Sequence, residues 1–403
     1  MERYNEYKDS GVQWLGEIPS HWDMRRTKYV WQETDNRSEF GSEQLLSVSQ
    51  YDGVREAQSD SRSESLKGYK IVKQDELVIN IMLAWLGGLG VSKHEGIVSP
   101  AYCVYKLQDT QNPRFLHYLY RTPIYLAEFA RHSTGIVPSR WRMYTDDFGE
   151  VLTLLPPIEE QNAMVAYLDT ATAKIDEAIA QQQKMIDLLN ERKQIIINNA
   201  VTKGLNPNVK MKDSGVDWIG EIPEHWMTRR MRYLCKIKTG DKDTINRVDD
   251  GKYPFYVRSP KVERINSYTF DGEAVLMAGD GVGAGKVFHY VNGKFGCHQR
   301  VYIFHDIKNI NGEYLYFYMK SLFKHTIEQL SAKSTVDSVR LNMIQDFIVA
   351  IPTNEEQTSI LSYLYKQIRK FDVAISNATK QISLLQERKQ IIINEVVTGK
   401  VKV

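Results

Sequence analysis

A chain of 403 residues, 42% hydrophobic and 25% charged, has room for two domains or for three small ones. Its net charge of +2 is too small to indicate nucleic acid by itself, and its three cysteines and nine histidines show neither a disulfide framework nor metal-ligand spacing. No apolar run approaches the roughly 18 residues that cross a bilayer, and the N-terminus does not resemble a signal peptide. These features predict a cytoplasmic, metal-free protein.

The N-terminal motif KDSGVQWLGEIPSHW (Lys8–Trp22) occurs twice in the chain. Its copy, KDSGVDWIGEIPEHW (Lys212–Trp226), lies just past the middle and differs at three positions. Repetition over this length indicates a duplicated architecture, in which one job is done at two places.

Each copy leads into a basic segment of the pattern Arg-Arg-x-Lys/Arg-Tyr. Cationic side chains suit contacts with phosphates, and arginine also suits bidentate contacts with guanine. Because both halves carry the same pattern, structure or phosphate contact suits it better than sequence reading, and a solvated face is the alternative. The candidate DNA-binding residues here are Arg25, Arg26, Lys28, Arg229, Arg230 and Arg232.

The first variable stretch has the pattern of a mixed α/β domain. ELVINIM (76–82) and YCVYKL (102–107) predict strands, and residues 112–132 form an amphipathic helical pattern. A flexible basic loop without acids, RHSTGIVPSRWR, follows at 131–142, and such loops suit phosphates. Its candidate DNA-binding residues are Arg131, Ser133, Thr134, Arg140 and Arg142.

A long helical block follows each variable stretch. The two blocks share ERKQIIIN (191–198 and 387–394), and each opens with EEQ, where carboxylates favour the positive end of the helix dipole. A 3.5-residue repeat in each block predicts a coiled coil, with a helix packed on its own domain as the alternative. The seam residues are Ile175, Ile179, Gln182, Ile186, Leu189, Lys193, Ile196 and Ala200 in the first block, and Phe371, Ile375, Ala378, Ile382, Leu385, Lys389, Ile392 and Val396 in the second. Lys193 and Lys389 occupy equivalent seam positions, where they either fix the register or turn outward.

The second variable stretch also reads as mixed α/β, with strands at 273–278 and 301–307 and a helix at 311–330. GDGVGAGK (279–286) fails the phosphate-loop pattern at Asp280 and Val287, so a glycine-rich turn is favoured, and SPAY (99–102) lacks the Asn of an adenine-methyltransferase loop. No nucleophile motif is present, and we expect no catalytic residue. The candidate DNA-binding residues of this half are Lys286, Lys333, Ser334, Thr335 and Arg340.

These elements predict an α+β chain with a pseudo-twofold internal repeat. Two globular α/β domains would be separated by two long helices packed as an antiparallel coiled coil. The predicted segments are 1–158, 159–206, 207–353 and 354–403, with net charges of −3, −2, +4 and +3.

Taken together, the motifs resemble those of the specificity subunit of type I restriction–modification enzymes, and the resemblance covers the whole chain. It rests on SGVQWLGEIPSHW with its copy, on EEQNAMVAYLD and LLNERKQIIINNAVTKGL with their copies, and on VINIMLAWLGGLGVSKHEGIVSPAYCVY in the first variable stretch. The resemblance implies two target-recognition domains, each of which reads one half of an asymmetric bipartite site in double-stranded DNA. It also implies two modification subunits and ATP-dependent restriction subunits as partners. S-adenosylmethionine, ATP and Mg would then be bound by those partners, with no cofactor and no catalysis in this chain.

The predicted seam is compatible with that role. From Ile175 to Ala200 it would rise about 38 Å at ~1.5 Å per residue, close to the ~34–36 Å of one DNA turn. Two alternatives remain open from sequence: a two-headed scaffold for proteins, and an enzyme whose site is not recognised.

Overall fold

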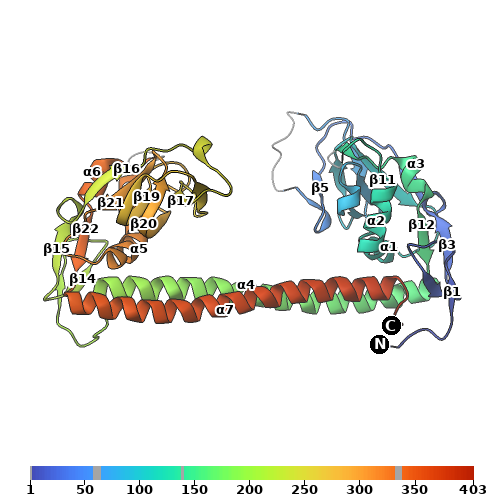
Figure 1. The fold of residues 1–403 in the computed structure, drawn as a ribbon. Coiled ribbons are helices and arrows are strands. Elements are labelled where there is room, and N and C mark those ends of the chain that lie inside the picture. Colours follow the sequence, from blue (N-terminus) through green and yellow to red (C-terminus); the bar gives the residue numbers. More distant parts are fainter. Residues whose placement is uncertain (1, 58–64, 138–139, 332–337) are drawn as a thin grey trace. The chain divides into compact units, whose positions relative to one another are not determined.

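The computed structural model describes residues 2–57, 65–137, 140–331 and 338–403, and the chain divides into two compact units. Unit 1 consists of residues 1–182 and 380–403, and unit 2 consists of residues 183–379. The end of the second helical block therefore folds with the first variable stretch, and each unit contains part of both long helices (Figure 1).

Unit 1 places short antiparallel strands and three short helices before a long helix. The strands are β1 (Tyr7–Asp9), β2 (Glu17–Pro19), β3 (Asp23–Arg26), β4 (Trp31–Thr34), β5 (Leu46–Ser49), β6 (Gly53–Glu56), β7 (Lys70–Val72), β8 (Leu77–Asn80), β9 (Leu89–Val91), β10 (Gly96–Val98), β11 (Tyr102–Leu107) and β12 (Leu152–Leu155). The helices are α1 (Pro113–Tyr120), α2 (Pro123–Arg131), α3 (Thr145–Glu150) and α4 (Ile158–Lys203).

The main sheet of unit 1 has the order β4-β11-β8-β9, and its neighbouring strands are antiparallel. All four residues of β8 are buried, and its three apolar side chains alternate between two different hydrophobic clusters. Leu77 and Ile79 join the main core of the unit, and Val78 joins a smaller cluster on the other face. The two-sided burial explains why three successive residues of this strand are apolar.

The amphipathic pattern at 112–132 forms two helices. Pro123 is the first residue of α2, a position where its fixed φ and missing N–H are tolerated. A proline also disfavours the helical conformation of the residue before it, so α1 ends at Tyr120.

Unit 2 repeats this plan with longer strands. They are β13 (Met211–Asp213), β14 (Glu221–Pro223), β15 (Met227–Arg230), β16 (Lys236–Thr239), β17 (Tyr253–Tyr256), β18 (Glu263–Ile265), β19 (Phe270–Ala278), β20 (Phe288–Cys297), β21 (Val301–His305) and β22 (Ile348–Ile351). The helices are α5 (Gly312–Ser331), α6 (Leu341–Gln345) and α7 (Asn354–Val397).

The main sheet of unit 2 has the order β16-β21-β19-β20-β17-β18, in which only the described pair β17–β20 is parallel. Helix α5 packs against β19 and β20. Side chains of β19 alternate between two clusters, with Val275 and Met277 in the main core and Ala274 and Leu276 in a second one. Sheet and helix thus repeat the arrangement of unit 1 on a different sequence.

Helices α4 and α7 run antiparallel, and both complete the cores of the units. In unit 1, Val396 and Val397 of α7 pack in the main core with Leu168 of α4. In unit 2, Val201 of α4 packs in the main core with Leu364 of α7. The start of each helix therefore lies beside the end of the other, as Figure 1 shows. The antiparallel pair expected from the sequence is confirmed.

The two seam lysines bind carboxylates on the opposite helix. Lys193 Nζ lies 2.6 Å from Asp372 Oδ1 in unit 2, and Lys389 Nζ lies 2.6 Å from Asp176 Oδ1 in unit 1. These pairs are equivalent in the repeat, and about a quarter of each lysine side chain is exposed. Both lysines thus pair across the helices, which is the contact that a role in register requires. Because the aspartates are more than half exposed, such pairs contribute little stability, and we assign them to register.

The remaining seam positions are buried or half-buried, while most positions between them are exposed. The buried ones are Ile175, Ala200, Ala378 and Val396, and the half-buried ones are Ile179, Gln182, Ile186, Leu189, Ile196, Phe371, Ile375, Ile382, Leu385 and Ile392.

Candidate nucleic-acid interface

The two repeated motifs of the sequence meet at the start of each long helix. In unit 1, His21 Nε2 lies 2.6 Å from Glu160 Oε1, and Trp22 Nε1 donates to Glu160 Oε2 at 3.1 Å. In unit 2, His225 Nε2 lies 3.0 Å from the Glu356 carboxylate, and the Trp226 indole N–H donates to the same group. We call this contact the His-Trp–Glu joint, and it explains why HW and EEQ are repeated together.

The glutamine of each EEQ fastens the variable stretch to the same helix start. Gln161 Oε1 accepts the Asn112 amide at 2.9 Å, and Gln357 Oε1 accepts the Asn311 amide at 2.7 Å. Both glutamines are almost fully buried. The asparagine side chains in turn accept amides in the first turn of α1 and of α5. The repeated letters are therefore structural.

The joint predicts a pH dependence of stability. Burial raises the pKa of Glu356, but hydrogen bonds from Thr353, His225 and Trp226 outweigh burial and hold this pKa below its ordinary value. A depressed folded-state pKa stabilises the fold above the unfolded pKa and loses that contribution as the pH falls through the folded one. We expect Glu356→Gln to cost about 1–2 kcal/mol in the free energy of unfolding at pH 7. The difference from wild type should narrow below about pH 4.5.

Urea unfolding at several pH values measures this effect. Glu355→Gln is the matched control, since Glu355 is an exposed neighbour in the same helical turn. Equal losses of stability in the two variants, or a loss that does not change with pH, would contradict the assignment.

The repeated arginine pattern lies at a strand edge and binds carboxylates in both units. In unit 1, Arg26 and Lys28 both lie 2.6 Å from Glu150, the last residue of α3. In unit 2, Arg230 and Arg232 share Asp346, which follows α6. These side chains therefore fasten the edge strand to the end of the short helix, which matches their sameness in both halves.

The first arginine of the repeated pattern differs between the units. Arg25 lies 2.7 Å from Asp109, whereas the described part of the chain gives the exposed Arg229 no ion-pair partner.

Two loops lie side by side at the same place in both units. We call residues 81–88 and 279–287 the glycine-rich turns, and residues 140–144 and 338–340 the pre-helix loops. The Met143 amide donates to Ile81 O at 3.0 Å, and the Val339 amide donates to Gly279 O at 2.7 Å. Each donor lies two residues before its short helix, and each acceptor follows the central strand directly. The two units thus present homologous loop pairs.

In unit 1, the candidate residues that precede the pre-helix loop are held by protein contacts. Arg131 is held in two hydrogen bonds by the buried Glu128, and the Ser133 hydroxyl donates to Phe129 O at 2.7 Å. Thr134 and Arg142 exchange backbone hydrogen bonds, which closes the loop. Within the described residues, the exposed Arg140 has no ion pair.

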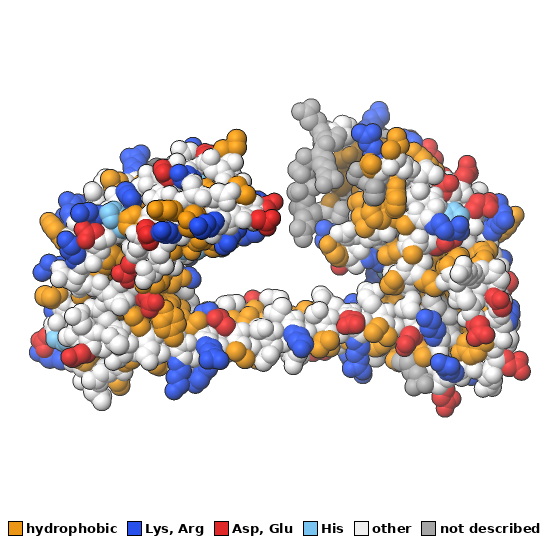
Figure 2. Space-filling model, in the orientation of Figure 1, with side chains coloured by type: hydrophobic (Ala, Val, Ile, Leu, Met, Phe, Trp, Pro, Cys, Tyr) orange, Lys and Arg blue, Asp and Glu red, His pale blue; other side chains and the backbone are white. Residues whose placement is uncertain are grey.

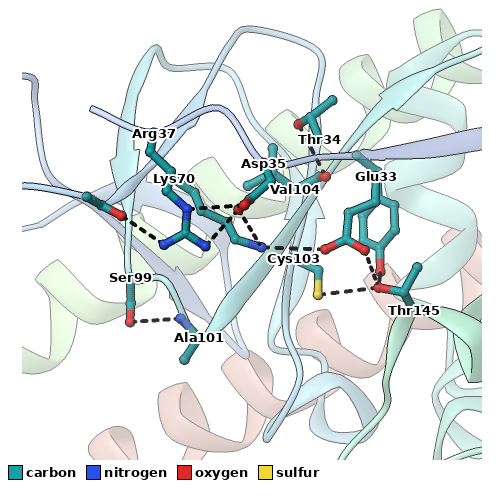
Figure 3. Close-up of polar contacts among 12 residues, drawn as sticks. Glu33, Thr34, Asp35, Arg37, Lys70, Ser99, Ala101, Cys103, Val104 and Thr145 are labelled. Atoms are coloured by element: carbon teal, nitrogen blue, oxygen red, sulfur yellow. Dashed lines mark hydrogen bonds and ion pairs between the residues drawn. The ribbon is translucent and has the colours of Figure 1, made fainter. Parts of the chain in front are cut away.

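The first turn of α3 is held by a polar network on the sheet (Figure 3). The Thr145 hydroxyl donates to Glu33 Oε2 at 2.6 Å, and Lys70, whose side chain is 8% exposed, lies 3.5 Å from the same carboxylate. Tyr105 and Cys103 of β11 also contact the Thr145 hydroxyl, and burial raises the pKa of the Cys103 thiol. Unit 2 has Leu341 at the corresponding first position of α6, so this support belongs to unit 1 alone.

In unit 2, the glycine-rich turn is packed against protein. A Cβ on Gly283 would lie 2.3 Å from Arg258 O, and a Cβ on Gly285, whose φ is +61°, would lie 2.0 Å from Ile327. The glycines therefore serve close packing, which agrees with the turn expected from sequence. Lys286 and Arg340 are exposed and have no ion pair in the described part of unit 2. Lys333, Ser334 and Thr335 lie outside the described residues.

Sequence reasoning missed one charged cluster beside this turn. Arg258 Nη1 and Arg300 Nη1 lie 3.2 and 2.5 Å from the two oxygens of Asp280. The three residues are far apart in the sequence and lie on separate loops. The only available signal was Asp280 itself, which stands where the phosphate-loop pattern needs glycine.

Positive charge is dispersed over the visible surface. Figure 2 shows lysine and arginine side chains interspersed with acidic ones on both units. Within residues 2–57, 65–137, 140–331 and 338–403, no three His, Cys, Asp or Glu side chains gather as a metal site would need. In the same ranges no helix has the length and apolarity to cross a membrane.

The two units share one duplicated α+β fold. Residues 223–384 match the family model described as type I restriction modification DNA specificity domain. The Escherichia coli type I restriction enzyme EcoDI specificity subunit is 31% identical over 180 residues, which cover 45% of this chain and 39% of that subunit. The putative type I restriction enzyme MjaX specificity subunit of Methanocaldococcus jannaschii is 22% identical over 96% of both chains. This chain is therefore similar to type I restriction–modification specificity subunits, and its residues 223–384 match their DNA specificity domain.

A solved structure also shares the fold. A chain reported in work on complex assembly and conformational transition of the type I R-M system has a TM-score of 0.69 at 15% identity, over 95% of this chain and 99% of that one. The chain matches less than half of the length of that Escherichia coli subunit.

Proposed function

We propose that this chain is the DNA-specificity subunit of a type I restriction–modification complex. Each unit would read one half of an asymmetric bipartite site in double-stranded DNA. The helices α4 and α7, which both units share, would set the spacing of the half-sites. The chain would have no catalytic role of its own.

One observation carries this proposal: the two units keep the same frame but differ at the loops. The His-Trp–Glu joint and the hydrogen bond between pre-helix loop and glycine-rich turn occur in both units. The residue that follows the acceptor of this hydrogen bond differs: it is Met82 in unit 1 and Asp280 in unit 2. One fold with two different loop surfaces is what recognition of two different half-sites requires.

The paired helices also offer two equivalent surfaces for a partner. Leu188 and Ile195 on α4 and Leu384 and Ile391 on α7 are each about half exposed, off the seam, and seven residues apart within each pair. We call these the two apolar rows, and Figure 2 shows hydrophobic side chains at the surface of the helices. Exposed apolar residues beside a satisfied seam indicate a further contact. Two equivalent rows fit two copies of one partner, which we take to be the modification subunits.

The chemistry would then belong to the partners. S-adenosylmethionine would be bound by the modification subunits, and ATP and Mg by restriction subunits that join the complex for cleavage. Proteins of the family are named for specificity, and the fold supports a role in positioning these partners on DNA.

Single-molecule sequencing of genomic DNA tests the proposal. Cells that express the chain with its cognate modification subunit should contain N6-methyladenine at one bipartite, asymmetric motif on both strands, and cells without the chain should lack it. A complex that forms but neither methylates nor binds DNA specifically would favour the protein scaffold. Methylation by the chain alone would favour an unrecognised enzyme.

A further inference from the structure

The cluster of Arg258, Asp280 and Arg300 in unit 2 has the geometry of a prepared base contact. The Asp280 carboxylate is 17% exposed, while 43% of the Arg258 side chain and 59% of the Arg300 side chain are exposed. Burial raises the pKa of Asp280, but hydrogen bonds from Arg300 and Arg258 outweigh it and keep this pKa below its ordinary value. Two guanidinium groups thus share one carboxylate and leave a net positive charge with unused donors.

The backbone under the cluster is fixed on three sides. Gly283 packs against the carbonyl of Arg258, as described above. His298 Nδ1 accepts the Arg300 amide at 3.1 Å, and burial lowers the pKa of His298, which favours the neutral ring that this bond needs. Asp280 forms an isolated β-bridge with Ser338 of the pre-helix loop. The cluster therefore stands on a rigid support beside the candidate loops.

Arginine in this setting favours a guanine edge over an isolated phosphate. Its planar fork matches the O6 and N7 acceptors of guanine in two parallel hydrogen bonds, and a carboxylate that orients the fork in advance reduces the entropy lost on binding. Arg300 is the more exposed of the two arginines and contacts Asp280 through Nη1 alone in the hydrogen bonds described. Val282, 96% exposed at the apex of the same turn, adds an apolar group for base contact.

The corresponding place in unit 1 has the same turn but different side chains. The Tyr102 amide donates to Ser99 O at 3.0 Å at the start of β11, and the Val301 amide donates to His298 O at 2.9 Å at the start of β21. The residue directly before each strand is Ala101 in unit 1, labelled in Figure 3, and Arg300 in unit 2. Unit 1 also has Met82 at the position that Asp280 occupies in unit 2. The charged cluster is therefore present in unit 2 and not at the equivalent place in unit 1, as a determinant of one half-site should be.

We propose that Arg300, oriented by Asp280, reads a guanine in the half-site recognised by unit 2. This assignment rests on the proposed function and names one of its specificity-determining residues. Arg258 balances the charge of Asp280 and holds it in place.

The test uses the full chain with its modification subunit and compares wild type with Arg300→Lys and Arg300→Ala. A good bidentate contact discriminates against the wrong base by roughly 1–3 kcal/mol, so about tenfold or more. We expect both variants to lose at least about tenfold of the preference for guanine at one position in one half of the methylated motif. The other half-site and the midpoint of thermal unfolding should stay unchanged. Arg247→Ala, at an exposed arginine paired with Asp249 in the same unit, is the control and should leave the motif intact.

The lysine variant separates base reading from other roles. A phosphate contact would survive Arg300→Lys, and a structural role would lower the melting temperature without changing the base preference. Either result, or an unchanged motif in both variants, would overturn the assignment while leaving the proposed function in place. Absence of methylation at any motif by the wild-type complex would contradict both this assignment and the proposed function.

A chemical substitution in the DNA gives a second measurement. Replacing the guanine in question by 7-deazaguanine removes the N7 acceptor. It should weaken binding by wild type by about tenfold, the loss of one good base contact, and should have little effect on the Arg300→Ala variant. Equal sensitivity of the two proteins would contradict a contact from Arg300.

Discussion

Replacing Trp226 by alanine is expected to lower the free energy of unfolding of unit 2 by about 3–5 kcal/mol. Trp226 is fully buried in the main core of the unit, and its indole N–H donates to Glu356. The ring also packs under Gly204, where an added Cβ would lie 3.2 Å from it. Truncation would therefore open a cavity at the point where α4 ends and leave the Glu356 carboxylate without one donor.

Urea unfolding of the full chain measures this effect, with two variants for comparison. Trp226→Phe keeps most of the apolar volume and removes the donor, so it should cost less, about 1–2 kcal/mol. Trp22→Ala should act like Trp226→Ala, because Trp22 makes the equivalent contact with Glu160 in unit 1. A loss below about 1 kcal/mol for Trp226→Ala would show that the joint is not needed for the core.

The repeat was the most informative feature of the sequence because it links residues that touch. The letters HW and EEQ predicted a duplicated frame and a helix start, and the structure has both. That His225 and Trp226 contact Glu356 was not predictable, since about 130 residues separate them and no local spacing connects them. A pattern in the chain reports local geometry, whereas a joint of this kind depends on the tertiary fold.

Charged side chains show the same limit from the other direction. The pattern at Arg26 and Lys28 is visibly basic in the sequence, but its carboxylate, Glu150, comes from the end of a helix more than 100 residues away. The sequence gives no sign of the cluster at Arg300, because this arginine stands alone in the chain. Only the fold places it beside Asp280. The charge pattern of a sequence therefore overestimates how many cationic side chains are available for a ligand, because it does not show their carboxylate partners. It also misses arginines that only the tertiary fold brings together.

The apolar rows on the helices could be recognised in part from sequence. Both lie inside the repeated stretch LLNERKQIIIN or its copy, one position before each seam residue Leu189, Ile196, Leu385 and Ile392. The heptad pattern places Leu188 and Ile195 off the seam, but only the structure leaves them uncovered, with 52% and 51% of their surface exposed. Apolar residues that widened the seam would be covered by the other helix. Because these remain exposed, they fit a surface for a partner instead.

Replacing Leu188 and Ile195 together by glutamate is expected to remove one of two bound modification subunits. The folded chain should tolerate the change, because both side chains are exposed and glutamate is a good helix former. Two central apolar contacts of about 1.5–2 kcal/mol each would be lost at the partner interface, so association there should weaken by roughly 100-fold or more. The unchanged row on α7, formed by Leu384 and Ile391, should still bind its copy. Mass measurement of the purified complex should therefore give one modification subunit per chain instead of two, and the quadruple variant should give none.

A matched control separates docking from a general effect of added charge on the helices. Asn190→Glu and Asn199→Glu add the same number of charges on α4 at exposed positions outside the apolar row, and they should leave two partners bound. The variant with Leu384→Glu and Ile391→Glu should mirror the first one, because the repeat makes the two rows equivalent. Retention of two partners by the quadruple variant would place the docking surface elsewhere. Loss of both partners from a single-row variant would mean that the two copies bind cooperatively or through one another, which contradicts independent equivalent rows.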